Sequence, residues 1–101
     1  MWLFALFDLP VMTKDQRRTY TRFRKLLLVQ GFTMLQYSVY AQYCPSEEGS
    51  LAKRRSLRTN LPSDGQVRLV SITDKQFAAM EVHLGKTDVD PEQPMGQGLL
   101  F

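Results

Sequence analysis

Residues 1–8 have the sequence MWLFALFD, an apolar run that ends in a carboxylate, and Leu9 and Pro10 follow it. An apolar run of this length, closed by Asp and Pro, is typical of a strand that is buried on both faces. The run is far too short to cross a membrane as a helix. Asp8 therefore lies at the C-terminal end of a buried strand, where it either caps the following turn or is held for chemistry.

The length and composition indicate one small folded domain. The chain has 101 residues, with 44% apolar and 11% aromatic residues, as expected for a globular protein that can gain stability by pairing with a second copy. The single cysteine, Cys44, excludes an intrachain disulfide and a cysteine-based metal site. Because the N-terminus lacks the basic segment of a signal peptide, we expect a cytoplasmic protein.

Positive charge is concentrated in the first part of the chain. Residues 1–60 contain ten Lys or Arg and four Asp or Glu, a balance of +6, whereas residues 61–101 contain three and six, a balance of −3. A basic segment of this kind favours contact with a polyanion, although many basic faces are only solvated.

The clearest periodic pattern predicts a helix from about residue 13 to residue 30. Thr13 and Gln16 have the spacing of a capping box, and Gly31 provides a stop at the C-terminal end. One arc of this helix is apolar, and the opposite arc carries six cations and no acid, which favours phosphate contact over simple solvation. The apolar arc contains Tyr20, Phe23, Leu26 and Leu27, and the basic arc contains Lys14, Arg17, Arg18, Arg22, Arg24 and Lys25.

A strand and a second helix are predicted next. Residues 32–43 alternate in the manner of a strand that is rich in aromatic and β-branched residues. Ser46 then begins a helix that ends near residues 61–62. This helix carries a second basic cluster, which we expect to contact phosphates as well: Lys53, Arg54, Arg55 and Arg58.

The remaining residues predict further strands and a tail. Turn residues at 63–65 precede a strand over residues 66–73, and a short turn at residues 74–75 follows. Residues 77–84 are expected to form a fourth strand or a helical turn leading into one. Residues 86–97 have the polar, proline-containing composition of a linker.

We assign these elements to an α+β, ferredoxin-like fold of order β-α-β-β-α-β with an extra C-terminal strand. Residues 1–85 form the ferredoxin-like domain, and residues 86–101 form a linker and the C-terminal strand. The three apolar residues at the end need a place to be buried, and an exposed sheet edge on another protomer or on a protein partner is the expected docking place. These residues are Leu99, Leu100 and Phe101.

Four short segments also occur in a distinctive order. They are the strand end Phe7-Asp8, the Arg-rich residues 17–25, the sequence QYSVY at residues 36–40 and the sequence VSITDKQF at residues 70–77. Each segment is common alone, but the four together resemble the small CRISPR-associated spacer-acquisition protein, the Cas-two family. The resemblance covers residues 1 to about 85.

The resemblance implies a bacterial ferredoxin-like homodimer of the obligate type, whose C-terminal strand crosses to the sheet of the partner protomer. It implies a role in CRISPR adaptation, in which the homodimer bridges two dimers of the Cas-one family integrase and holds prespacer duplex DNA through its phosphates. It also implies a metal-dependent endonuclease that cuts RNA or duplex DNA, with Asp8 as the catalytic residue and as the ligand of Mg²⁺ or a similar cation.

The leading interpretation from the sequence is an adaptor that binds duplex DNA, and the alternative is a metal-dependent nuclease. A DNA-binding adaptor would depend on the basic residues, whereas a Mg²⁺-dependent phosphodiesterase would depend on Asp8. A toxin-like ribonuclease that works without an integrase is a third alternative. No second carboxylate lies near Asp8 in the sequence, but one or two carboxylates can suffice for Mg²⁺, and a two-fold dimer could bring Asp8 from both copies to a shared site.

Other polar and aromatic residues are expected to have ordinary structural roles. Ser38 has no base beside it and is predicted to be a strand residue rather than a nucleophile. His83 is expected at the surface or at an interface. Tyr37 and Tyr43 share the phase of Val39 along the predicted strand, so we expect them in the core or the dimer interface rather than stacked on bases.

Overall fold

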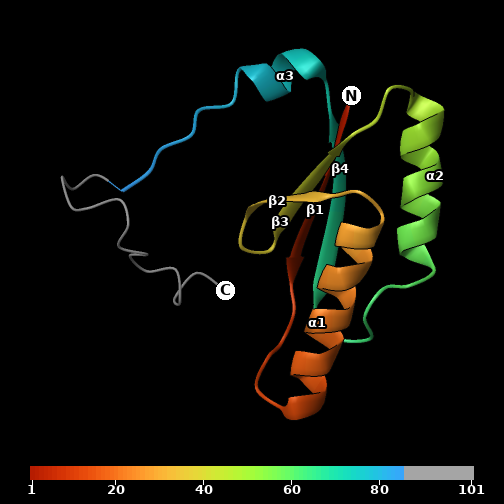
Figure 1. The fold of residues 1–101 in the computed structure, drawn as a ribbon, viewed down its shortest axis with the longest axis vertical. Helices are drawn as coiled ribbons and strands as arrows, with labels where there is room; N and C mark the ends of the chain where they lie inside the picture. The colour runs from red at the N-terminus through yellow and green to blue at the C-terminus, as the bar shows by residue number, and fades with distance from the viewer. Residues whose placement is uncertain (86–101) are drawn as a thin grey trace.

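The computed structural model describes residues 1–85, which form a four-stranded antiparallel sheet and three helices (Figure 1). The elements are β1 Trp2–Asp8, α1 Lys14–Val29, β2 Thr33–Gln36, β3 Val39–Tyr43, α2 Glu47–Arg58, β4 Gln66–Ile72 and α3 Asp74–Ala78. The order through β4 is β-α-β-β-α-β, so the predicted ferredoxin-like α+β fold is confirmed.

β1 is the central strand and is hydrogen-bonded on both sides. The strand order is β2-β3-β1-β4, and all three pairings are antiparallel. Leu3 and Ala5 are completely buried on one face of β1, and Phe4 on the other face is only 8% exposed. The apolar run at the start of the chain is therefore a strand that is buried on one face and partly buried on the other, where Trp2 and Leu6 remain half-buried.

The main core lies between β1 and the two long helices. Phe7 contacts Phe23 of α1 edge-to-face, with ring centroids 5.2 Å apart, and it stacks on Tyr40 of β3. Leu57 of α2 belongs to the same buried cluster. Burying one such side chain contributes about 1.5–3 kcal/mol. α1 and α2 therefore cover the same face of the sheet, the face that carries Leu3, Ala5 and Phe7.

Capping residues determine where the long helices begin and end. Thr13 Oγ1 accepts a hydrogen bond from the Gln16 amide, and Gln16 Oε1 accepts one from the Thr13 amide, so the predicted capping box is present. Ser46 caps α2 as predicted. Gly31 follows α1 with a φ of +95°, the left-handed conformation that ends a helix.

The prediction of one strand over residues 32–43 is wrong, because these residues form a hairpin. β2 and β3 are joined by a turn at residues 37–38, and Ser38 has a φ of +62°. Ser38 is thus a turn residue and not a strand residue. Tyr-Ser is not one of the dipeptides that normally mark a two-residue hairpin turn. The alternating pattern of residues 32–43 therefore predicted one continuous strand instead of two strands and a turn.

Residues 74–78 form α3, where the sequence predicted a short turn at residues 74–75. Thr73 and Gln76 form a capping box that starts this helix. Phe77 stacks on Trp2 with ring centroids 3.9 Å apart, and it contacts Phe4 edge-to-face. α3 ends at Ala78 and no strand follows it within the described residues, so the prediction of a strand within residues 77–84 is wrong.

α3 occupies the side of the sheet opposite α1 and α2. Trp2 and Phe4 alternate with the core residue Leu3, so they point away from the two long helices. Figure 1 shows α3 next to the N-terminus, at the end of the sheet where β4 finishes. α3 thus covers one end of this second sheet face.

Residues 86–101 lie outside the described residues, and they include the predicted linker and the predicted docking residues. These docking residues are Leu99, Leu100 and Phe101. Within the part of the chain that the structure describes, no helix is long and apolar enough to span a membrane.

Gly65 brings the start of β4 against the end of β1, and its replacement tests this packing. Gly65 has a φ of +81°, and a Cβ at this position would lie 2.3 Å from the carbonyl oxygen of Asp8. Backbone strain and steric overlap therefore both oppose a side chain. We predict that Gly65→Ala lowers the free energy of unfolding by roughly 2 kcal/mol or more, as measured by urea denaturation.

Gly85→Ala is the matched control, because a Cβ at Gly85 would have no atom within 4 Å. Its free energy of unfolding should stay within about 1 kcal/mol of the original protein. If Gly65→Ala and Gly85→Ala were equally stable, the close approach of β4 to Asp8 would be contradicted.

Candidate functional site

Asp8 is the exposed last residue of the central strand β1. Its cross-strand partner is Gln66, the first residue of β4. Alternation along β1 places Asp8 on the same face as Leu6 and Phe4, opposite the face that α1 and α2 cover. We call this opposite side of the sheet the open face. Asp8 is therefore held at the border of the open face by a strand that is paired on both sides.

The carboxylate of Asp8 makes no hydrogen bond or ion pair with any residue in the range 1–85. A turn-capping role would require this carboxylate to accept a hydrogen bond from a nearby backbone amide, and the structure contains no such bond. Both oxygens are thus available to a cation or a substrate. Carboxylate oxygens are the kind of ligand that Mg²⁺ prefers.

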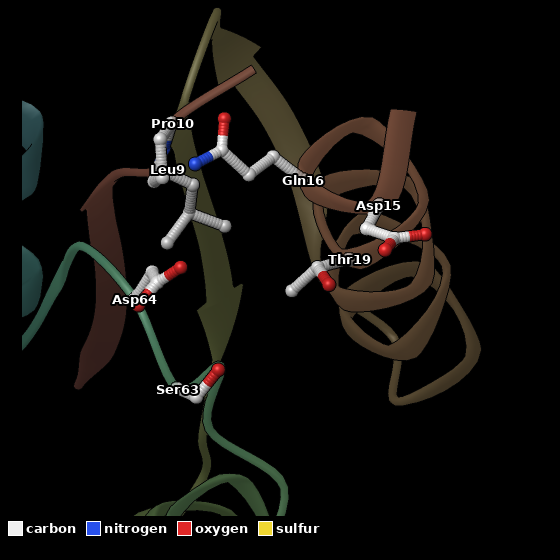
Figure 2. A pocket seen from close by; sticks show the side chains of 7 residues that line it. All are labelled: Leu9, Pro10, Asp15, Gln16, Thr19, Ser63 and Asp64. Carbon is white, nitrogen blue, oxygen red and sulfur yellow. The ribbon is translucent and has the colours of Figure 1, made fainter. Parts of the chain in front are cut away.

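Asp8 is separate from the neighbouring acids. Asp15 and Asp64 line a cleft of about 150 Å³ beside Leu9 and Pro10, and Figure 2 shows them on opposite sides of this cleft. Across residues 1–85 there is no group of three or more His, Cys, Asp or Glu side chains that could hold a metal ion. One chain therefore presents a single available carboxylate at the strand end rather than a complete metal cage.

The open face next to Asp8 is mostly apolar. Its apolar residues are Trp2, Phe4 and Leu6 of β1, Val39, Ala41 and Tyr43 of β3, and Val70 and Ile72 of β4. Phe77 covers Trp2 and Phe4, and next to them Val70 and Tyr43 remain 43% and 48% exposed, whereas Leu6 and Val39, nearer to Asp8, are half-buried. Exposed apolar side chains on one face of a sheet are typical of a protein–protein contact. The end near Asp8 is the part that α3 leaves uncovered.

Two polar residues of β4 share the open face with Asp8, and the sequence analysis did not identify them as site residues. Gln66 lies opposite Asp8, and Arg68 lies opposite Leu6. Arg68 Nη1 donates a hydrogen bond to Gln66 Oε1 at 3.0 Å. The alternation of side chains along β4 predicts that both residues lie on the same face of the sheet. Their position beside Asp8 follows only from the way that β4 pairs with β1.

The basic arc of α1 is exposed, and two of its six cations have partners. Arg17 Nη1 donates to the carbonyl oxygens of Val11 and Met12, at 3.2 Å each, and thereby holds the loop before the helix. Arg18 lies 3.5 Å from Asp15 in an exposed pair that contributes less than about 1 kcal/mol. The other cations of this arc have no partner among the described residues: Lys14, Arg22, Arg24 and Lys25.

The basic cluster of α2 contains two cations that form hydrogen bonds within the fold and two that could bind a ligand. Lys53 Nζ donates to the Gln30 carbonyl oxygen at the end of α1, at 2.8 Å. Arg54 donates to Ser71 Oγ of β4 at 2.6 Å. These two half-buried side chains attach α2 to its neighbours. Arg55 and Arg58 are exposed and have no partner in the described part of the chain.

The remaining candidate residues contribute no catalytic group. His83 Nε2 lies 3.0 Å from Glu81 Oε1 in a highly exposed pair, so His83 is a surface residue. Tyr40 is the tyrosine buried in the core, at 1% exposure, and Tyr43 lies on the open face. Ser38 lies in the hairpin turn.

Comparison with known proteins identifies the family. Residues 1–80 match the family described as CRISPR associated protein Cas2. The chain is 44% identical to the "CRISPR-associated endoribonuclease Cas2" of Parvibaculum lavamentivorans, over 100% of both chains. It is 40% identical to the protein of the same name from Flavobacterium psychrophilum, over 100% of this chain and 88% of that relative.

A solved structure supports the fold. The "Crystal structure of Streptococcus pyogenes Cas2 at pH 6.5" matches 84% of this chain and 100% of its own, with a TM-score of 0.65 and 17% identity. At this identity the likeness concerns the fold alone. The family match over residues 1–80 and the full-length relatives together show that this chain belongs to the CRISPR-associated protein Cas2 family.

Proposed function

We propose that the chain is a Mg²⁺-dependent endoribonuclease that works as a homodimer centred on Asp8. The observation that carries this proposal is the exposed carboxylate of Asp8, which ends a buried strand and has no partner among residues 1–85. Two relatives that align along the whole chain are named endoribonucleases, which supports the same activity.

A divalent cation fits the chemistry of this position. Mg²⁺ keeps several water molecules and is commonly held by one or two carboxylates together with the phosphates of a substrate, so Asp8 does not need a cage of acids around it. When bound, the metal would polarise a phosphoryl oxygen and make a bound water more acidic. Asp8 holds the cation at a strand end, where an RNA strand has access from solvent.

A second copy of the chain supplies the second carboxylate. The open face is apolar and only partly covered by α3, and a two-fold dimer formed through it would pair the same patch on both copies. Asp8 borders the uncovered end of this patch. Such a dimer would therefore place the Asp8 carboxylates of both copies near one another.

Asp8→Asn tests the nuclease directly. The substitution keeps the size of the side chain but removes the charge that attracts the metal. We predict a loss of Mg²⁺-dependent cleavage of labelled single-stranded RNA of at least about 100-fold, since a metal contributes several kcal/mol of charge stabilisation. The unfolding curve should not change, because the Asp8 side chain makes no hydrogen bond or ion pair among residues 1–85 that the fold would lose.

Asp15→Asn is the control, because Asp15 is an exposed acid that is not on the open face. It should cut RNA at the original rate, and EDTA should stop cleavage by both Asp15→Asn and the original protein. Equal, Mg²⁺-dependent cleavage by Asp8→Asn would rule out this residue as the metal ligand. Cleavage in the absence of any integrase would fit the toxin-like alternative as well.

The unpartnered cations favour a second function, in which the same dimer holds duplex DNA during spacer acquisition and bridges integrase dimers. The described residues contain six cations of the predicted binding set with no protein partner: Lys14, Arg22, Arg24, Lys25, Arg55 and Arg58. They lie on α1 and α2, on the side of the sheet away from the open face. Lys and Arg side chains arranged in this way bind phosphates without reading bases.

Neighbouring arginines of α2 provide a matched test of this second function. We predict that Arg55→Ala combined with Arg58→Ala weakens duplex DNA binding and reduces the salt dependence of log K by about 0.9 for each phosphate contact removed. Arg54→Ala should instead lower the free energy of unfolding by about 1–3 kcal/mol, because the Ser71 hydroxyl and the Leu69 carbonyl lose their donor.

Fluorescence anisotropy at several salt concentrations measures the binding, and urea denaturation measures the stability. If the double variant bound duplex DNA with unchanged affinity and unchanged salt dependence, α2 would not be part of the DNA-binding surface.

A further inference from the structure

We propose that Arg68 is a phosphate-binding residue of the Asp8 site and that Gln66 positions its guanidinium. The ligand is the phosphodiester group of the RNA that Asp8 and its metal act on. This inference rests on the proposed nuclease function, because it assigns the group that holds the substrate beside the metal ligand.

The register of the sheet places Arg68 next to Asp8. Asp8 pairs with Gln66, and Leu6 pairs with Arg68, so all four residues lie on the open face. Arg68 is thus the diagonal neighbour of Asp8 across the two strands. Diagonal neighbours in an antiparallel pair are about 7–8 Å apart at the backbone, which is within reach of a long side chain.

Arg68 is distinctive because the strands carry hardly any charge. Among the residues of β1, β2, β3 and β4, Arg68 is the single Lys or Arg. Besides Gln66 and Asp8, its neighbours on the open face are Leu6 and Val70, which are apolar. A cation in an apolar surface is costly once that surface is covered, unless an anion accompanies it. An anionic ligand beside Asp8 would meet this requirement.

The hydrogen bonds of Arg68 leave most of its donors free. Nη1 donates to Gln66 Oε1 at 3.0 Å, and no carboxylate in the described part of the chain lies within 4.0 Å of the guanidinium. A guanidinium has five N–H donors in a planar fork that matches two phosphate oxygens. Gln66 therefore fixes one edge of the group and leaves the others for a phosphate.

Asp8 and Arg68 do not form an ion pair with each other. The two side chains share one face and have opposite charges, yet they do not approach within 4.0 Å. Arg68 is therefore not neutralised by Asp8 and would be able to bind a substrate phosphate, while Asp8 would hold the metal that supplies charge stabilisation. Arg68 would neutralise and orient the phosphate, and no proton transfer is required of it.

The experiment compares Arg68→Ala with Arg68→Lys and with the control Lys75→Ala. Lys75 is an exposed residue of α3 with no assigned role. Single-stranded RNA binding is measured by anisotropy with Ca²⁺ in place of Mg²⁺, and single-turnover RNA cleavage is measured in Mg²⁺. Sedimentation velocity of each variant reports its oligomeric state.

We expect Arg68→Ala to raise the Kd for RNA about tenfold or more, which is the effect of losing a charged hydrogen bond. Arg68→Lys should keep part of the affinity, because it retains the charge but lacks the fork. Lys75→Ala should match the original protein. Gln66→Ala should raise the Kd less than Arg68→Ala does, because Gln66 only positions the guanidinium.

Two results would overturn the inference. One is an unchanged Kd and cleavage rate for Arg68→Ala. The other is a change in oligomeric state alone, with normal RNA affinity once the protein concentration restores the original assembly, which would mean that Arg68 pairs with the second copy. If the original protein cut no RNA, the nuclease proposal would fail, while the binding comparison would still decide the role of Arg68.

Discussion

The pairing of β1 with both β3 and β4 is the constraint on which the rest of the structure depends. Leu3 and Ala5 have no exposed surface, and a shift of one residue in register would turn them toward the wrong face. The same register places Asp8 on the open face and puts Gln66 directly opposite it. The proposed site therefore takes its geometry from the packing of the core, and its residues lie on strands rather than on loops, which favours precise positioning.

The two proposed activities use opposite sides of the molecule. Asp8 borders the open face, whereas the unpartnered cations lie on α1 and α2, which cover the other face of the sheet. A dimer formed through the open faces would leave α1 and α2 of both copies on the outside. Phosphate contacts on the helices would then not compete with dimer formation or with access to Asp8. Two of the cations have structural roles, because Lys53 attaches α2 to the end of α1 and Arg54 attaches α2 to β4.

Local signals in the sequence predicted the elements that depend on local interactions. The capping box at Thr13, the end of α1 at Gly31 and the burial of most of the apolar run in β1 follow from side-chain chemistry and periodicity, and all are present. The hairpin turn at Ser38 was missed because its two residues carry no usual turn signal. Arg68 was missed for a different reason. Its place beside Asp8 depends on which residues of β4 pair with which residues of β1, and this pairing cannot be predicted from a single sequence. For the same reason, charge patterning alone did not separate Arg54 from Arg55.

Paramagnetic broadening of backbone NMR signals by Mn²⁺ tests the central claim, that Asp8 holds a divalent cation at the end of β1. Mn²⁺ prefers the same oxygen ligands as Mg²⁺ and broadens signals only near the bound ion. The account predicts that substoichiometric Mn²⁺ broadens the amides of Asp8 and Gln66 first and that Asp8→Asn abolishes this effect. Broadening centred on the cleft of Asp15 and Asp64, or broadening at Gln66 that persists in Asp8→Asn, would contradict it.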